Sequence, residues 1–164
     1  MVTNAELSTA TELLLPPLPL AEWQATYDTL HMWTQIVGKV RLEQCPAINH
    51  WWGVALYTTA NGLTTSPIPF GNESFEVEFD FLKHELVIET SRGEIRKIKL
   101  EPKTVAQFYK EFLAALHELG IDVSIYTTPA EFPNPIPFEK DETHAAYDAE
   151  AVSRFWRVLQ WSDM

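Results

Sequence analysis

The sequence predicts an α+β fold: an antiparallel meander of about five to six short strands, with two long helices and a C-terminal helix packed against the sheet. Residues 75–81, FEVEFDF, alternate apolar and acidic side chains, which is typical of a strand with one buried face. Residues 105–119 instead repeat apolar side chains every three or four positions, which is typical of a helix with one buried face. Separate stretches with these two periods favour segregated helices and strands.

The first helix is expected to begin at about Pro19. Its apolar stripe consists of Trp23, Tyr27, Leu30, Thr34 and Val37. Gly38 weakens the prediction beyond that point. If the helix continues, Arg41 falls on the same face, and His31, Gln35 and Lys39 form a flanking stripe with a spacing of four residues.

Two further helices carry clear start signals. Thr104 and Gln107 fit a capping box before residues 105–119, and Gly120 suits the helix end. Asp148 can cap a last helix. The apolar face of that helix is predicted to comprise Val152, Phe155, Trp156 and Leu159.

The strands are predicted from β-branched and aromatic runs between turn residues. Asn61-Gly62 suits a tight turn between two of them, and Pro67 and Pro69 are expected to stop regular pairing. Residues 129–138 hold four prolines, so we expect them to be extended. The expected strands are 51–59, 63–66, 75–81, 85–90, 94–100 and 121–126.

Length and charge limit the function classes. We expect residues 1–17 to be a flexible leader and residues 18–164 to be a single α+β domain, because 164 residues suit one domain. The net charge of −11, with Lys and Arg scattered, disfavours nucleic acid and acidic membrane surfaces as partners. Cys45 is the single cysteine, which suits a reducing compartment. No signal peptide and no apolar run of about 20 residues is visible, so we expect a cytoplasmic protein.

Motifs for several common chemistries are missing from the sequence. It contains no GxGxxG or GxxxxGK[ST] phosphate loop, no GxSxG elbow and no HExxH helix. The five histidines show no metal-ligand spacing, so we expect no metal and no cofactor. A metal site assembled from the distant His31, His50 and His144 stays open as an alternative.

Residues 49–53, NHWWG, raise the main question about function. On a strand, Trp51 and Trp52 would point to opposite faces, and His50 would share the face of Trp52. One tryptophan would fill the core, and the other would lie in a pocket or at an interface. Glu76, Glu78 and Asp80 alternate with phenylalanines and are expected on a solvated sheet face.

Neighbouring elements usually lie side by side, so polar residues from the first helix and the next two strands are expected to converge on a pocket. In that pocket Arg41 would hold an anionic group by two hydrogen bonds, His50 would move a proton, and a tryptophan would form the floor. The candidate ligand-binding residues are Thr34, Gln35, Lys39, Arg41, Asn49, His50, Trp51, Trp52, Thr64, Thr65 and Ser66.

Three functional hypotheses follow from this cluster. The first is a domain that binds a small polar or anionic ligand around Arg41, His50 and Trp51/Trp52. The second is an enzyme that uses His50 as its acid/base. The third is an interaction module in which the aromatic second face of the sheet forms a homodimer.

Several long stretches of the chain resemble a known family. They are LHMWTQIVGKVRL (30–42), NHWWGVALYTTANGLTTSPIPFG (49–71), FYKEFLAALHELGIDVSIYTTPAEFPNPIPFEKD (108–141) and HAAYDAEAVSRFWRVL (144–159). Together they resemble the bacterial family catalogued as domain of unknown function 5996, over about residues 18–160. The resemblance implies no activity. It implies that longer members carry a second segment with another His-aromatic-Trp motif. If two such segments face each other, a short chain would pair with a second copy of itself.

Overall fold

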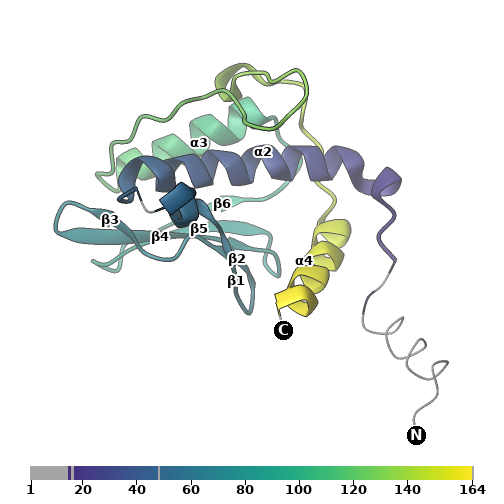
Figure 1. Cartoon of the computed structure of the whole chain (residues 1–164), viewed down its shortest axis with the longest axis horizontal. Coiled ribbons are helices and arrows are strands. Elements are labelled where there is room, and N and C mark those ends of the chain that lie inside the picture. The colour runs from purple at the N-terminus through teal and green to yellow at the C-terminus, as the bar shows by residue number, and fades with distance from the viewer. Residues whose placement is uncertain (1–14, 16, 48, 164) are drawn as a thin grey trace, which may run out of the picture.

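The computed structural model describes residues 15, 17–47 and 49–163 (Figure 1). The expected leader lies mostly outside these residues. The described elements are α2 (Leu20–Gln44), η1 (Asn49–Val54), β1 (Tyr57–Thr58), β2 (Gly62–Thr64), β3 (Ile68–Phe70), β4 (Glu73–Asp80), β5 (Glu85–Thr90), β6 (Ile95–Lys99), α3 (Val105–Glu118), η2 (Phe138–Lys140) and α4 (Ala149–Asp163). The α+β prediction is confirmed.

The strands described form one antiparallel sheet in the order β1-β2-β4-β5-β6, and β3 pairs with the free part of β4. Helices α2 and α3 lie across one face of this sheet (Figure 1). Phe75, Val77 and Phe79 of β4 are buried beneath the helices, as their alternation predicts. Glu76 and Glu78 lie on the opposite face, where they accept hydrogen bonds from the hydroxyls of Thr64 and Thr59.

Helix α2 is longer than its apolar stripe alone predicts. It passes through Gly38 and ends at Gln44, where the Cys45 N–H bonds to the Arg41 carbonyl. Pro46 follows, and the residue before a proline is disfavoured in the helical conformation. Its core face carries Trp33, Ile36, Val37 and Val40, all fully buried.

The strand predicted for residues 51–59 is wrong over most of its length. Asn49–Val54 form the short 3-10 helix η1, and only Tyr57–Thr58 pair with β2. His50 has a φ of 45°, which is incompatible with an extended strand. Residues 49–54 pack on α2, and the pairing with β2 begins only at Tyr57. The opposite-face placement of Trp51 and Trp52 therefore does not apply.

Two further strand expectations are also wrong. Residues 121–126 form no strand, although Ile121 and Ile125 are buried as their alternation predicts. An extended segment with one buried side gives the same alternation of apolar residues, whether or not it pairs with another strand. Pro69, expected to stop pairing, instead lies within β3, opposite Ser74 of β4. This is a short edge strand, where a missing N–H is tolerated.

The helix signals near residues 104 and 148 are confirmed, with one change. The Thr104 hydroxyl accepts the Gln107 N–H at 3.1 Å, but the Gln107 side chain donates to Glu111 and not back to Thr104. Only half of the capping box forms. Gly120 has a φ of 75°, as a helix-ending glycine should. Asp148 Oδ1 accepts the N–H groups of Glu150 and Ala151.

The half-formed capping box leads to a prediction about the stability of the domain. Thr104→Ala leaves the Gln107 N–H without its side-chain acceptor, and we expect it to lower the free energy of unfolding by about 1 kcal/mol. Thr104→Ser keeps a hydroxyl at this position and should restore most of the loss. Urea titration of the three proteins measures both values. Equal stability of Thr104→Ala and wild type would contradict the role of the cap.

Candidate functional site

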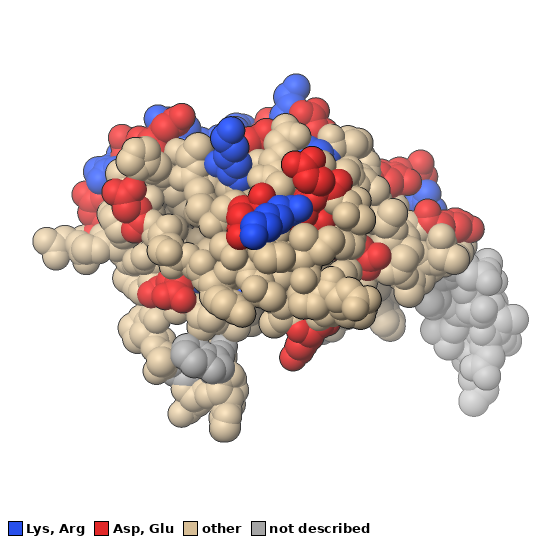
Figure 2. All heavy atoms as spheres, turned by 90° about the horizontal axis from the view of Figure 1, so that it is seen from above, with Lys and Arg blue, Asp and Glu red and all other residues tan. Residues whose placement is uncertain are grey.

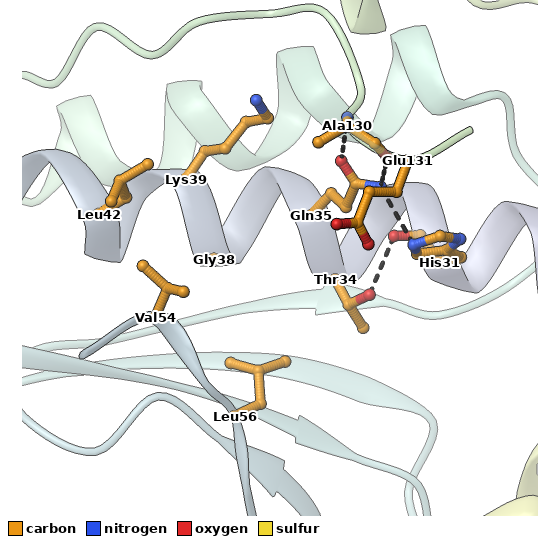
Figure 3. Close-up of a pocket in the computed structure, with 10 residues that line it drawn as sticks. All are labelled: His31, Thr34, Gln35, Gly38, Lys39, Leu42, Val54, Leu56, Ala130 and Glu131. Atoms are coloured by element: carbon orange, nitrogen blue, oxygen red, sulfur yellow. Dashed lines mark hydrogen bonds between the residues drawn. The ribbon is translucent and has the colours of Figure 1, made fainter. Parts of the chain in front are cut away.

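A cleft of about 380 Å³ lies between α2, residues 54–56 before β1, and residues 126–138, called here the proline-rich segment (Figure 3). Helix α2 forms one wall, residues 54 and 56 form the floor, and residues 130 and 131 form the other wall. The lining residues are His31, Thr34, Gln35, Gly38, Lys39, Leu42, Val54, Leu56, Ala130 and Glu131.

The flanking stripe of α2 holds the proline-rich segment in place. The His31 ring lies 6.1 Å from the Phe132 ring, Gln35 bonds to Ala130, and the Lys39 ammonium lies 5.0 Å from the centre of the Tyr126 ring. Residue numbers thus increase along α2, from 31 to 35 to 39, while those of their partners decrease, from 132 to 130 to 126. The segment therefore runs antiparallel to α2 along this stripe.

Gln35 makes the most specific of these contacts. Its Oε1 accepts the Ala130 N–H at 2.8 Å, and its Nε2 donates to the Ala130 carbonyl at 2.8 Å. The two bonds fix the orientation of the amide, so Nε2 faces His31 Nε2 at 3.0 Å as a donor. The neutral His31 ring then carries its proton on Nδ1. Ala130 is fixed to α2, although 95 residues separate it from Gln35.

Lys39 is the cation of the cleft. Its ammonium lies over the rings of Tyr126 and Phe138, at 5.0 Å and 5.9 Å from their centres. Burial lowers its pKa, and the nearby Tyr126 and Glu43 act in the opposite direction. No carboxylate of the described residues forms an ion pair with it. Its positive charge is therefore held by aromatic faces.

Gly38 opens the middle of the cleft. It lies inside a continuous helix, and a Cβ built at this position meets only the Val54 carbonyl oxygen, at an ordinary 3.8 Å. Neither the backbone conformation nor a close contact therefore requires glycine there. Leu42, Val54 and Leu56 supply the apolar part of the lining.

The structure brings together three of the residues predicted for the site, namely Thr34, Gln35 and Lys39. Arg41 is 8% exposed and does not line the cleft. Its Nη1 donates to the Ala55 carbonyl, and its guanidinium lies 5.3 Å from the centre of the Tyr57 ring. In these contacts Arg41 fastens the chain between η1 and β1 to the end of α2.

The remaining candidates lie elsewhere. Asn49, His50 and Trp52 are exposed on η1, and nothing is described of the Trp51 side chain. Among the described residues the His50 ring has no hydrogen-bond partner. The hydroxyls of Thr64 and Thr65 bond within the sheet, and the Ser66 N–H donates to Thr64. None of these described residues lines the cleft.

The lining residues that sequence reasoning did not include among the ligand-binding candidates are His31, Gly38, Leu42, Val54, Leu56, Ala130 and Glu131. One signal was available, because Gly38 interrupts an otherwise regular apolar helix pattern. The prolines after residue 128 predict an extended segment but not the helix face along which it runs. Glu131 has a φ of 54°, a conformation that no local sequence pattern announced.

The alternative metal site from His31, His50 and His144 is not assembled. His31 and His144 lie against the same ring, that of Phe132, at 6.1 Å and 5.2 Å. The His144 Nδ1 lies 2.7 Å from Asp141 Oδ2, and Asp141 is 1% exposed. Within residues 15, 17–47 and 49–163, no three His, Cys, Asp or Glu side chains are placed to hold a metal ion. In the same ranges no helix combines the length and apolarity that crossing a membrane requires.

Comparison with known protein families gives a match over nearly the whole chain. A family model described as a family of unknown function, DUF5996, matches residues 15–164. No curated protein and no solved structure matches the chain. Because the match covers nearly all of the sequence, the chain belongs to this family of unknown function.

Proposed function

We propose that this protein binds a small polar or anionic molecule in the cleft beside α2. The observation that carries the proposal is Gly38. A glycine in a helix interior costs roughly 1 kcal/mol relative to alanine. Neither the backbone nor the packing requires that cost, because an added Cβ fits. What the missing side chain provides is open space in a cleft with polar and apolar walls, and positions that sacrifice stability in this way are typical of functional sites.

The surface charge supports a small ligand over nucleic acid. Figure 2 shows acidic and basic side chains interspersed on the face viewed from above, with no continuous basic patch. The net charge of −11 would repel a polyanion. We also propose that residues 18–164 act as one domain in the cytoplasm, where the free Cys45 would stay reduced.

The enzyme alternative gains no support at His50, which lies on η1 and does not line the cleft. The homodimer alternative loses its expected location, because Trp52 lies on η1 and not on a face of the sheet. One observation still favours it: Trp52 is 67% exposed, and Tyr57, further along the same segment, is 48% exposed. Large exposed aromatics on one short segment are typical anchors of protein interfaces.

The glycine makes a paired prediction. Gly38→Ala should raise the free energy of unfolding by about 0.5–1 kcal/mol, because alanine favours the helix and its Cβ has room. Gly38→Leu should fill the cleft. A thermal-shift screen of small polar and anionic molecules should give stabilising hits for wild type that weaken with Gly38→Ala, whose methyl group takes part of the open space, and disappear with Gly38→Leu. Hits that survive Gly38→Leu, or a screen without any hit, would contradict the proposed function.

The contact between Gln35 and Ala130 predicts local dynamics. Gln35→Ala removes both hydrogen bonds to Ala130, so opening of this wall should become easier by about 1–2 kcal/mol. Exchange of the Ala130 amide hydrogen should then be about 5–30 times faster. Gln24→Ala is the matched control, because the Gln24 amide bonds to Asp28 on the exposed side of the same helix. Unchanged exchange at Ala130 would show that the wall is held by other contacts.

The homodimer alternative has its own test. Light scattering over a range of concentrations should detect a dimer, and Trp52→Ala should dissociate it. Trp161→Ala, at a tryptophan that is 52% exposed on α4, serves as the control and should leave the dimer intact. A monomer at every concentration would refute this alternative.

A further inference from the structure

We propose that the ligand of the cleft is a small zwitterion with its charges at opposite ends of an apolar body. Its anionic end would lie at Lys39, its cationic end at Glu131, and its body against Leu42, Val54 and Leu56. This inference rests on the proposed function and adds the chemical class of the ligand.

The anionic end is assigned from the surroundings of Lys39. The ammonium lies over the rings of Tyr126 and Phe138 and has lost part of its hydration. The nearby Tyr126 and Glu43 compensate for this loss only in part, because the pKa of Lys39 stays lowered. No described carboxylate pairs with it and no described acceptor bonds to it. A ligand carboxylate would restore a charge partner, and a partly desolvated pair interacts more strongly than one in water.

The cationic end is assigned from Glu131. Its φ of 54° places a non-glycine residue in the left-handed region, which costs about 1–2 kcal/mol. The preceding residue, Ala130, is held by Gln35, so the backbone keeps this conformation. In Figure 3 the Glu131 carboxylate points back toward the hydroxyl of Thr34. The Glu131 side chain is exposed and no cation of the described residues pairs with it, so its carboxylate is accessible to a ligand ammonium.

The apolar part of the cleft lining determines the body of the ligand. Lys39 and Glu131 belong to different walls of the cleft, and the side chains of Leu42, Val54 and Leu56 contribute hydrocarbon. A simple anion would satisfy Lys39 but lie near an unpaired carboxylate. A simple cation would pair with Glu131 but lie near the ammonium of Lys39. A molecule with both charges and a hydrocarbon spacer matches the wall charges and the apolar floor together.

The test compares probes that share one hydrocarbon chain: 6-aminohexanoate, hexanoate and hexylamine. Isothermal titration with the full chain should give a Kd for 6-aminohexanoate at least about tenfold lower than for either singly charged probe, a difference of about 1.4 kcal/mol. Norleucine, an isomer of 6-aminohexanoate with both charges at one end, should bind no better than hexanoate.

Two variants assign the ends. Lys39→Met should raise the Kd of 6-aminohexanoate about tenfold and leave that of hexylamine unchanged. Glu131→Gln should do the same to 6-aminohexanoate and leave hexanoate unchanged. Lys110→Met, at an exposed lysine of α3, is the control and should change none of these values.

The outcomes separate the two proposals. If Gly38→Leu blocks binding but hexanoate, hexylamine or norleucine binds as tightly as 6-aminohexanoate, the zwitterion inference is overturned and the cleft remains a binding site. If the charge variants leave all Kd values unchanged, the assignment of Lys39 and Glu131 is overturned. If no probe binds to wild type, the zwitterion inference fails. The broader screen with Gly38→Leu then decides the proposed function separately.

Discussion

Trp33 determines how α2 sits on the rest of the molecule. Its ring is fully buried and stacks on Phe108 of α3, with centres 4.7 Å apart, and on Tyr147, at 5.6 Å. Stacked aromatic pairs of this kind hold both the distance and the rotation of the elements that carry them. The hydroxyls of Thr26 and Thr29 reinforce this by accepting the N–H groups of Asp148 and Ala146, just before α4. The rotation of α2 about its axis is thereby set.

The rotation of α2 about its axis determines which of its side chains face away from the core. With Trp33, Ile36 and Val37 facing the core, the helical period directs His31, Gln35 and Lys39 to the flank. These three side chains meet the proline-rich segment, which has no strand partner and depends on such contacts. The polar stripe is thus structural over most of its length. The cleft lies over Gly38, where the side chains of α2, η1 and the proline-rich segment do not fill the space between them.

The parts of this fold that could be predicted are those whose residue pattern is compatible with a single type of secondary structure. Residues 85–90 and 105–118 follow their sequence signals because alternation or helical spacing continues through a whole element. The strand prediction for residues 51–59 was wrong because aromatic and β-branched residues are common in any buried segment, and not only in paired strands. Of the residues predicted for the site, those that line the cleft are all on α2: Thr34, Gln35 and Lys39. The helical period placed Gln35 and Lys39 on the flanking stripe but assigned Thr34 to the face toward the core. The opposite wall of the cleft depends on a contact between positions 35 and 130, which no local pattern encodes.

The two walls of the cleft differ in what holds them. The α2 wall belongs to the hydrophobic core through Trp33 and its neighbours, so it opens only when the domain unfolds. The wall at Ala130 and Glu131 is exposed and is anchored to α2 by the amide of Gln35. A molecule that contacts both walls would therefore stabilise mainly the weaker one. Binding and the order of the proline-rich segment are then coupled, because each lowers the free-energy cost of the other.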